Sequence, residues 1–492
     1  MNSKGYNIEI DWKPDKNLKV PVYKQIIEYI KKKIRNGDWI VGQKLPSQRK
    51  LAEIFHVNRS TIVAAMDELC SYGILESGFG RGTKVASNTW SILISNNTPN
   101  WGNLINGGSF QENKPIVKII NKMEYEEGII RLGTGELSPK FLPKEKIEKI
   151  FKSISKNIDE LNYLEPLGLM NLRKEICRRV QKLGIEAEPD NVLITSGSLQ
   201  ALHLLSICIL EKGSKVYTEN VSYVRSLNLF QSSGISLCGI PMDKEGMDFY
   251  KISQLKNDSH LSSIIYTIPS FQNPTNRVMS KNRRKELINF CNENRLPVIE
   301  DNAYGELYFE EMDERPLKSM DKNGTVLYLG SISKTLAPGI RIGWIIGPQS
   351  VIKRLGDAKM QIDYGVSSIS QWFLYEFYSS GLYDEYLDSI RSELKKKRNI
   401  MIEYLEKYYS DIASWNIPQG GFYIWARFNS NIDTDKLFYK AVQNKVIINP
   451  GSIYGAESKN YIRFSYAYED EERMKKGLKI IRKLIDDEMI RN

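Results

Sequence analysis

The stretch from Thr325 to Trp344 reads TVLYLGSISKTLAPGIRIGW, and the organisation of most of the chain can be worked out from it. Its apolar beginning predicts a β-strand, and Lys334 follows in a turn of hydroxyl-bearing and small residues. Lysine attacks a carbonyl only as the neutral amine, which partly buried surroundings favour. The stretch therefore suits an imine between Lys334 and an aldehyde cofactor whose phosphate is held by Ser331 and Arg341. A strand followed by a solvated lysine is the alternative that this stretch alone leaves open.

Three other segments carry polar residues that could bind an aldehyde cofactor or its substrate. Asp301 ends an apolar run and is followed by Tyr304, Asn273 follows a second apolar run, and Arg463 lies within a third. In this order and at this spacing, the segments resemble the fold-type I aminotransferases that use pyridoxal 5′-phosphate (PLP). The resemblance covers the chain from about residue 129 to its C-terminus.

The resemblance implies a role for each of these side chains. Lys334 would form the Schiff base with PLP, and Asp301 would pair with the pyridine nitrogen. Asn273 and Tyr304 would bond the phenolic oxygen, and Arg463 would hold a substrate carboxylate. These roles agree with the chemistry of the groups, because a carboxylate keeps the ring nitrogen protonated and the ring then accepts electrons. The planar guanidinium of arginine matches the two oxygens of a carboxylate.

Further cofactor contacts follow from the same resemblance. A strand, a small-residue turn and a helix start place Gly197, Ser198 and Leu199 at a helix N-terminus, where backbone N–H groups hold phosphate. Tyr223 would stack on the pyridine ring. Tyr163 would reach the phosphate of a partner subunit's cofactor, which implies a homodimer; a packing role for Tyr163 is the alternative. The fold class is α/β, with a mostly parallel sheet and a smaller C-terminal α/β subdomain.

Residues 15–86 have the pattern of a winged helix-turn-helix. Apolar residues recur at helical spacing in two short segments after residue 20, Ser47 is placed to cap the second helix, and a third helix starts at about Arg59. A glycine-rich β-hairpin follows as the wing. The segments Leu45-Pro-Ser-x-Arg49-x-Leu-Ala52 and Arg59-x-Thr61 resemble the GntR family of bacterial regulators. The expected DNA contacts are therefore Arg49, Arg59, Ser60, Thr61 and Arg81.

Composition excludes several classes of protein. The chain of 492 residues is 41% hydrophobic and 26% charged, which is typical of packed domains rather than of disordered chains. No apolar window approaches the length of a membrane span, and the first residues lack a signal core, so a cytoplasmic protein is expected. Five scattered cysteines and three histidines argue against a disulfide framework and against a metal site. Residues 1–90 hold 15 Lys and Arg against 9 Asp and Glu, so this part carries +6 of the net +10. A solvated lysine-rich surface explains that charge as well as a polyanionic partner does.

The sequence thus predicts a DNA-binding domain at 15–86, a polar linker at 87–118 and a PLP-binding, dimer-forming domain at 119–492. This layout resembles the MocR/GabR regulators. It implies a regulator that binds double-stranded operator DNA and senses a small amine or amino acid through PLP. A working aminotransferase that carries a DNA-binding domain is the alternative, because all the catalytic groups are present in the sequence. A protein without PLP that serves only in interactions is a third possibility.

Overall fold

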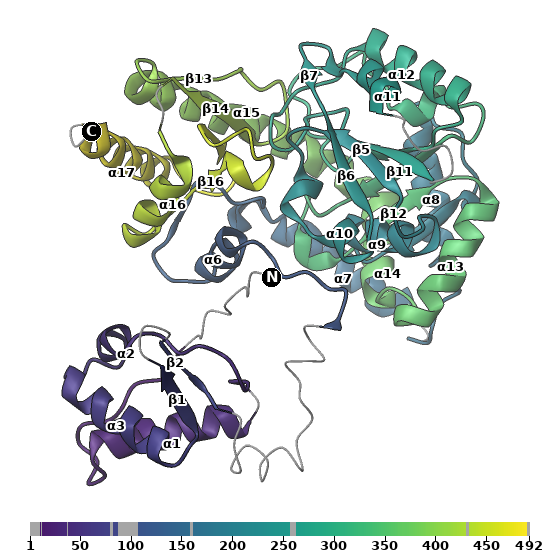
Figure 1. Ribbon diagram of the computed structural model, residues 1–492. Coiled ribbons are helices and arrows are strands. Elements are labelled where there is room, and N and C mark those ends of the chain that lie inside the picture. Colours follow the sequence, from purple (N-terminus) through teal and green to yellow (C-terminus); the bar gives the residue numbers. More distant parts are fainter. Residues whose placement is uncertain are drawn as a thin grey trace. The chain divides into compact units, whose positions relative to one another are not determined.

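The computed structural model describes residues 10, 12–36, 38–78, 82–86, 107–157, 161–255, 262–429 and 432–489. The chain divides into two units, Met1–Ser109 and Phe110–Asn492, which are shown together in Figure 1. We call the first unit the head and the second the body. Among the described residues, no helix combines the length and the apolar character needed to cross a membrane.

The described part of the head contains three helices and a two-stranded hairpin. They are α1 (Val22–Arg35), α2 (Gln48–Phe55), α3 (Arg59–Ser71), β1 (Leu75–Gly78) and β2 (Gly82–Val85). Ser47 caps α2, since its Oγ accepts a hydrogen bond from the backbone N–H of Lys50 at 3.2 Å. The apolar faces of the three helices meet in a core of their own, which includes Ile30, Leu51 and Leu69. The predicted winged helix-turn-helix is confirmed.

The body is built around a seven-stranded sheet in the order β4-β12-β11-β10-β9-β5-β6. Its strands are β4 (Val192–Thr195), β5 (Lys215–Glu219), β6 (Ser236–Ile240), β9 (Ser263–Thr267), β10 (Val298–Asp301), β11 (Val326–Ser331) and β12 (Gly343–Ile346). Only β12 runs antiparallel to its neighbours in this sheet. Most of the strand residues are buried, because helices cover both faces, and this explains why the strands read as continuous apolar runs. The mostly parallel sheet is as predicted.

Helices surround this sheet and link it to the smaller subdomain. The helices of the body are α6 (Pro115–Met123), α7 (Lys144–Asn157), α8 (Met170–Gln181), α9 (Ser198–Cys208), α10 (Leu229–Ser232), α11 (Ile252–Leu255), α12 (Lys281–Asn294), α13 (Gln349–Asp363), α14 (Ser368–Ser379), α15 (Leu382–Tyr409), α16 (Thr434–Gln443) and α17 (Glu471–Met489). The long helix α15 packs against α14 on the large-sheet side and against α17 on the other. It therefore joins the two parts of the body.

The smaller subdomain holds a four-stranded antiparallel sheet in the order β13-β14-β17-β16. Its strands are β13 (Ala413–Ser414), β14 (Tyr423–Phe428), β16 (Asn449–Pro450) and β17 (Tyr461–Ser465). Nearby, β15 (Val446–Ile447) pairs in parallel with β3 (Ile130–Arg131), while β7 (Met242–Asp243) and β8 (Gly246–Met247) form a separate hairpin. The pairing of β3 brings the start of the body beside its C-terminal part, so the subdomain is not built from C-terminal residues alone.

The start of the body differs from the boundary that composition suggested. The polar character of 87–118 predicted a linker throughout, but the body begins at Phe110 and α6 begins at Pro115. Gln111 donates its backbone N–H to Ser232 Oγ at 3.0 Å, so this polar segment is held to the body by hydrogen bonds rather than by an apolar face. The predicted linker end at 118 is therefore too late. Residues 87–106, with most of that linker, lie outside the described residues.

Candidate functional site

The candidate cofactor residues collect at one edge of the large sheet. Asp301 is the last residue of β10 and Ser331 the last of β11, and these two strands are parallel neighbours. Lys334 lies in the connection between β11 and β12, and Gly197 follows the end of β4, which pairs with β12. Parallel strands present their carboxyl ends together, so residues far apart in the sequence meet at this edge.

Lys334 is partly buried and points at a backbone carbonyl. Its Nζ donates a hydrogen bond to the carbonyl oxygen of Gly135 at 2.7 Å. A Cβ on Gly135 would lie 2.9 Å from the hydroxyl of Tyr423 and 3.4 Å from Lys334 Nζ. Only glycine at position 135 therefore leaves room for the lysine and the tyrosine together. The partner of Lys334 is a carbonyl and not a carboxylate, so within the described parts of the chain no ion pair holds the amine in place.

Asp301 is buried and held by two donors. Its Oδ2 accepts the hydroxyl proton of Tyr266 at 2.8 Å, and its Oδ1 accepts the backbone N–H of Ala303 at 3.2 Å. Burial raises the pKa of Asp301, while the two hydrogen bonds and the nearby charge of Lys334 lower it. A cation placed against this carboxylate would favour its ionised form.

Arg463 joins Asn273 and Tyr304 in one buried network. Arg463 donates from Nη1 to Asn273 Oδ1 at 2.8 Å and from Nη2 to the carbonyl oxygen of Gly133 at 2.6 Å. Asn273 Nδ2 in turn donates to the hydroxyl of Tyr304 at 3.2 Å. The guanidinium carbon lies 3.9 Å from the ring centroid of Tyr423. Arg463 is only 4% exposed, and its Nε has no hydrogen-bond partner among the described residues. Its charge is therefore met by neutral oxygens and aromatic rings, which suits an arginine that receives a carboxylate.

The candidate phosphate site lies where α9 begins. Gly197 precedes α9 with φ of 78°, and the helix starts at Ser198. Arg341 Nη2 donates to the carbonyl oxygen of Ser196 at 2.6 Å and would lie 2.8 Å from a Cβ on Gly197. The N–H groups of the first turn, including that of Leu199, have no partner within the helix, because an α-helix leaves its first N–H groups without internal acceptors. Arg341 and these groups together suit an anion at this end of the helix.

Ser331 is the hydroxyl at this edge of the sheet. Its Oγ donates to the carbonyl oxygen of Ile342 at 3.4 Å and accepts from the backbone N–H of Ser333 at 3.1 Å. The long first bond leaves the hydroxyl proton weakly held. Ser331 therefore can turn its proton to an anion at small cost.

Tyr223 and Tyr163 have different surroundings. Tyr223 donates its backbone N–H to the carbonyl oxygen of Asn273 at 3.0 Å, which fixes it beside the Asn273 network. Burial raises the pKa of its phenol. Tyr163 is 82% exposed, and its ring lies 5.2 Å from that of Tyr364, which is also exposed. Among the described residues, the ring contact of Tyr163 is thus with Tyr364 and not with a candidate cofactor residue of its own chain.

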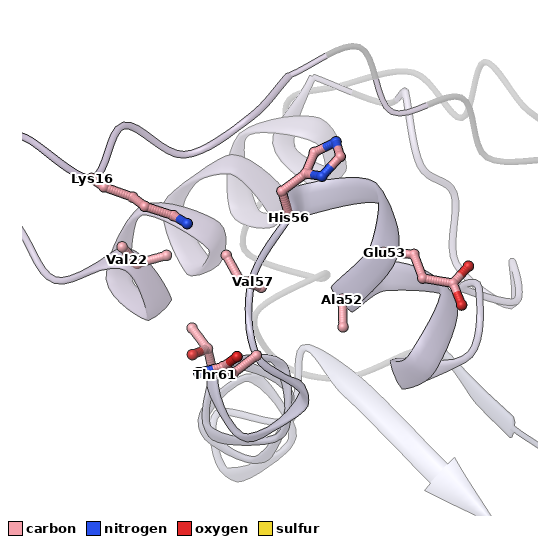
Figure 2. A pocket seen from close by; sticks show the side chains of 8 residues that line it. Lys16, Val22, Ala52, Glu53, His56, Val57 and Thr61 are labelled. Atoms are coloured by element: carbon pink, nitrogen blue, oxygen red, sulfur yellow. The ribbon is translucent and has the colours of Figure 1, made fainter.

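The predicted DNA contacts lie on the helix-turn-helix of the head. Arg59 and Ser60 are exposed at the first turn of α3, whereas Thr61 is half-buried. Thr61 lines a concavity of about 450 Å³ together with His56 at the turn between α2 and α3 (Figure 2). The side chain of Arg49 is 88% exposed, and its Nε lies 3.8 Å from a carboxylate oxygen of Glu53. Arg81 lies outside the described residues.

Several residues around Lys334 and Asp301 were missed from the sequence. Tyr266, Tyr423 and Gly135 approach these two side chains from strands and loops that are distant in the chain. Tyr266 carried a usable signal, because it lies in the apolar run of β9, the parallel neighbour of β10. The stretch from Ile129 to Gly135 resembles the start of the aminotransferase fold, which is expected near the substrate carboxylate, but the close approach of Gly135 to Tyr423 depends on the smaller subdomain.

Fold and site together define a class: an aminotransferase-type body joined to a winged helix-turn-helix head. The family described as aminotransferase class I and II matches residues 127–481, and the gntR family of bacterial regulatory proteins matches residues 22–85. The multiple substrate aminotransferase from Thermococcus profundus superposes with a TM-score of 0.73 at 28% identity, covering 80% of this chain and 100% of that one. The kynurenine aminotransferase of Pyrococcus horikoshii, solved in complex with PMP, superposes with a TM-score of 0.73 at 31% identity. The match covers 80% of this chain and 98% of that one.

Relatives with both parts are named as regulators. The uncharacterized HTH-type transcriptional regulator YisV of Bacillus subtilis is 46% identical over 95% of this chain and 96% of its own. The HTH-type transcriptional regulator NorG of Staphylococcus aureus (strain USA300) is 35% identical over 88% of this chain and 98% of its own. The chain belongs to this family of HTH-type transcriptional regulators, which join a gntR-type head to a class I and II aminotransferase body. The fusion predicted from the sequence is confirmed, and the regulator is supported over the metabolic enzyme.

Proposed function

We propose that the body binds PLP at Lys334 and senses a small amine or amino acid there, as in MocR/GabR-type regulators, and that this controls binding of the head to operator DNA. The observation that carries the proposal is a set of linked contacts around Lys334, Asp301 and Arg463, none of which has an ion pair among its hydrogen bonds to the described residues. The charge of Lys334 acts on Asp301, and Tyr423 lies both beside Gly135, which accepts from Lys334, and against Arg463. A structural lysine or arginine at such depth would be expected to have a carboxylate partner. The solved relative that holds PMP supports the choice of cofactor.

Each residue has a distinct task in this proposal. PLP supplies an aldehyde that a lysine or an incoming amine can hold covalently. Lys334 offers its amine from the Gly135 carbonyl, and Asp301 offers a buried carboxylate to a protonated ring nitrogen. Arg463 fixes the carboxylate of an amino acid, while Asn273 and Tyr304 hold the phenolic oxygen. Gly197, Ser198, Leu199, Ser331 and Arg341 hold the phosphate, and Tyr223 stacks on the ring.

The first prediction concerns the cofactor itself. The purified protein, once supplied with PLP, should absorb visible light, and the absorbance should shift when a reactive amino compound is added. Borohydride should then attach the cofactor permanently to one lysine, and peptide mass spectrometry should find it on Lys334. A colourless protein after PLP treatment, or a label on a different lysine, would contradict the proposal.

A second copy of the chain would complete the site. Tyr163, predicted to act across the interface, lies in a region with several exposed apolar side chains, which are Leu161, Tyr163, Ile362, Tyr364 and Ile369. Exposed apolar side chains that gather in one region are typical of a protein interface. A homodimer that covers them would bring Tyr163 to its partner's phosphate and would place two heads on one DNA duplex.

The segment that leads from the head into the body offers a route for coupling. Lys114 Nζ donates to the carbonyl oxygens of Arg225 at 3.0 Å and of Ile453 at 2.9 Å. Arg225 lies two residues after Tyr223, and Ile453 directly precedes Tyr454, whose ring faces Arg463 at 5.1 Å. Burial lowers the pKa of Lys114, so its ammonium depends on these two carbonyls. Any shift of the smaller subdomain against the large sheet would therefore pull on this segment.

The second prediction tests that route. Lys114→Met keeps the length of the side chain but removes both hydrogen bonds. We expect unchanged visible absorbance and unchanged operator affinity, with a reduced effect of the amine on that affinity; allosteric couplings are typically about 1–3 kcal/mol. Lys118→Met is the matched control, since Lys118 lies on α6 in an exposed ion pair with Glu112. Fluorescence anisotropy measures operator affinity with and without the amine. If the amine changes this affinity equally in Lys114→Met and Lys118→Met, the route through Lys114 is excluded.

A working aminotransferase remains the second candidate function, and a specific observation favours it. The groups that the reaction needs, Lys334, Asp301 and Arg463, are all present. Lys334 and Tyr423 meet beside Gly135, and Arg463 packs on the ring of Tyr423. Sustained conversion of an amino acid with a keto acid as acceptor would establish this activity. Regulation predicts binding of the amine without many turnovers.

A further inference from the structure

A cavity lies in the body beside the turn that carries Lys334, and Ser331 and Thr335 are among its lining residues. It has a volume of about 560 Å³ and is bounded by the loop after β10, the end of α8, α14, α15 and the strands β11 and β12. Its described lining residues do not include Lys334, Asp301 or Arg463. The volume falls within the range of about 300–1,000 Å³ that is usual for small-molecule sites.

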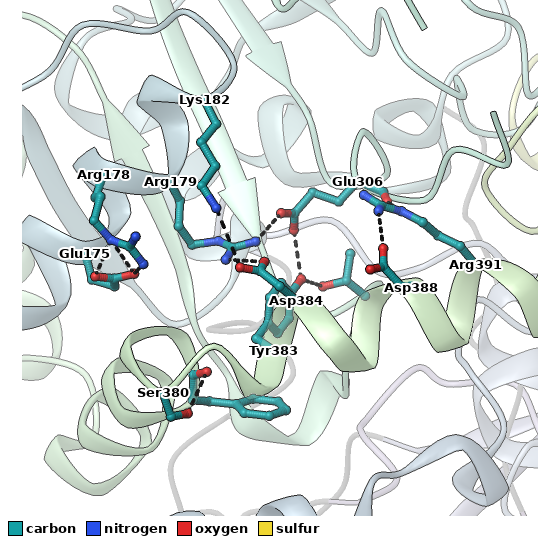
Figure 3. Close-up of polar contacts among 12 residues, drawn as sticks. Glu175, Arg178, Arg179, Lys182, Glu306, Ser380, Tyr383, Asp384, Asp388 and Arg391 are labelled. Carbon is teal, nitrogen blue, oxygen red and sulfur yellow. Dashed lines mark hydrogen bonds and ion pairs between the residues drawn. The ribbon is translucent and has the colours of Figure 1, made fainter. Parts of the chain in front are cut away.

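The inner charges of this cavity are already paired with one another. Arg179 donates to Asp384 Oδ1 at 2.7 Å and to Glu306 Oε1 at 2.9 Å, and Figure 3 shows these contacts. Arg391 donates to Asp388 Oδ1 at 3.0 Å and to the carbonyl oxygen of Glu306 at 2.7 Å. Because these side chains neutralise one another, the walls of the cavity carry little net charge. The cavity therefore does not favour a ligand with a net charge of either sign.

Two buried donors in the lining are left over. Trp344 is 7% exposed and Tyr378 is 1% exposed, and both line the cavity. Neither Trp344 Nε1 nor the hydroxyl of Tyr378 has a hydrogen-bond partner among the described residues. Buried polar groups in native proteins are almost always hydrogen-bonded, so two such groups around one cavity indicate an acceptor between them. An indole N–H can only donate a hydrogen bond. A molecule bound in the cavity must therefore present an acceptor to Trp344.

We propose that this cavity binds a small zwitterion, of amino-acid size and with one carboxylate, at a site that adjoins the proposed cofactor pocket at Ser331 but is not lined by Lys334, Asp301 or Arg463. The carboxylate would take the Trp344 and Tyr378 donors. The charged lining as a whole is slightly acidic, because its members are Arg179, Lys182, Arg315, Arg391, Glu306, Glu311, Glu314, Asp384 and Asp388. Glu311 is exposed and Glu314 is half-buried, so carboxylates stand at the open side, where the ammonium would lie. A polyanion would be repelled by this balance.

The site is connected to the turn that carries Lys334. The hydroxyl of Tyr383 is 2.8 Å from Glu306 Oε2 and 2.8 Å from the hydroxyl of Thr335, the residue after Lys334. Thr335 and Ser331 both line the cavity, on either side of Lys334 in the sequence. A ligand that rearranges Glu306 would therefore act on this turn. The binding claim itself does not depend on PLP.

The third prediction uses protein that contains 5-fluorotryptophan and has been treated with borohydride, so that no amine can exchange at Lys334. The chain has eight tryptophans, and the fluorine signal of Trp344 is assigned with Trp344→Phe. The probes are L-alanine, L-alaninamide, which lacks the carboxylate, and acetate, which lacks the ammonium. L-Alanine should shift the Trp344 signal in a saturable way, and the other two should do so far more weakly.

Tyr378→Phe should weaken L-alanine binding by at least about tenfold, because a hydrogen bond to a charged acceptor is lost. Tyr386→Phe is the matched control: its hydroxyl is also buried without a partner among the described residues, but it does not line the cavity. The melting temperature of Tyr378→Phe without ligand should not fall, which separates lost binding from lost folding. No shift with any probe, equal shifts with all three, or an undiminished shift in Tyr378→Phe would each overturn the proposal.

Discussion

Replacing Lys334 by alanine will abolish the transcriptional response to the effector and leave operator binding intact. The alanine protein keeps the other proposed contacts to PLP but cannot bond the cofactor covalently to the chain, so the exchange of that bond with an amine is lost. Among the described residues, the amine of Lys334 bonds to the carbonyl oxygen of Gly135 and forms no ion pair, so its loss breaks none there. The head has a core of its own, and its fold does not depend on the turn that carries Lys334. A reporter driven by the native promoter, measured across an effector titration, gives the response.

Lys334→Arg separates covalent chemistry from charge in the same assay. The arginine keeps a cation near Gly135 but does not form the bond to an aldehyde, so this variant should fail in the same way as Lys334→Ala. Both variants should bind operator DNA as the parent does. If Lys334→Ala responds to the effector like the parent, the cofactor pocket does not control transcription.

Arg59→Ala is expected to reduce operator affinity by about 1–3 kcal/mol if the guanidinium makes a bidentate contact with a base. That is about 5- to 150-fold. Arg59 is exposed at the first turn of α3, where a recognition helix meets base edges, whereas the side chain of Arg49 already lies near Glu53. Anisotropy titrations with an operator selected from random duplexes measure the loss.

Salt dependence shows which kind of contact Arg59 makes. Loss of a phosphate contact should lower the slope of log affinity against log salt by about one and weaken all sequences alike. Loss of a base contact should keep the slope and relax the sequence preference. Lys24→Ala is the control, because Lys24 is exposed on α1. Unchanged affinity in Arg59→Ala, or a loss no larger than in Lys24→Ala, would remove Arg59 from the interface.

Local sequence signals were enough to predict the fold of the head and the polar residues that follow the strands of the large sheet. Ser47 caps α2 as predicted, since capping depends only on the residues that follow. Asp301 and Lys334 were predicted from polar residues that follow apolar runs and from the resemblance to aminotransferases, and in the structure they lie at the end of β10 and just after β11. The network around Arg463 was only partly predictable, because Tyr423 reaches it from β14 and Gly133 from the bend after β3, and the pairing of both strands is set by the fold as a whole.

Boundaries and exposed side chains were harder to predict. Residues 111–114 are polar yet are held to the body by hydrogen bonds such as that of Gln111, which leave no trace in apolar periodicity. The cavity in the body gave no sequence signal, because Trp344 and Tyr378 read as ordinary core aromatics. Tyr163 is exposed, so its predicted role depends on a second copy of the chain.

The central claim is that a reaction at Lys334 changes how the head binds DNA. The most direct measurement is operator affinity across a titration of the amino compound that most strongly shifts the visible absorbance, made before and after borohydride treatment of the same protein. We predict that the compound changes the affinity of the untreated protein and has no effect on the treated one, since the cofactor is then locked on Lys334. The same change in affinity before and after treatment would contradict the claim.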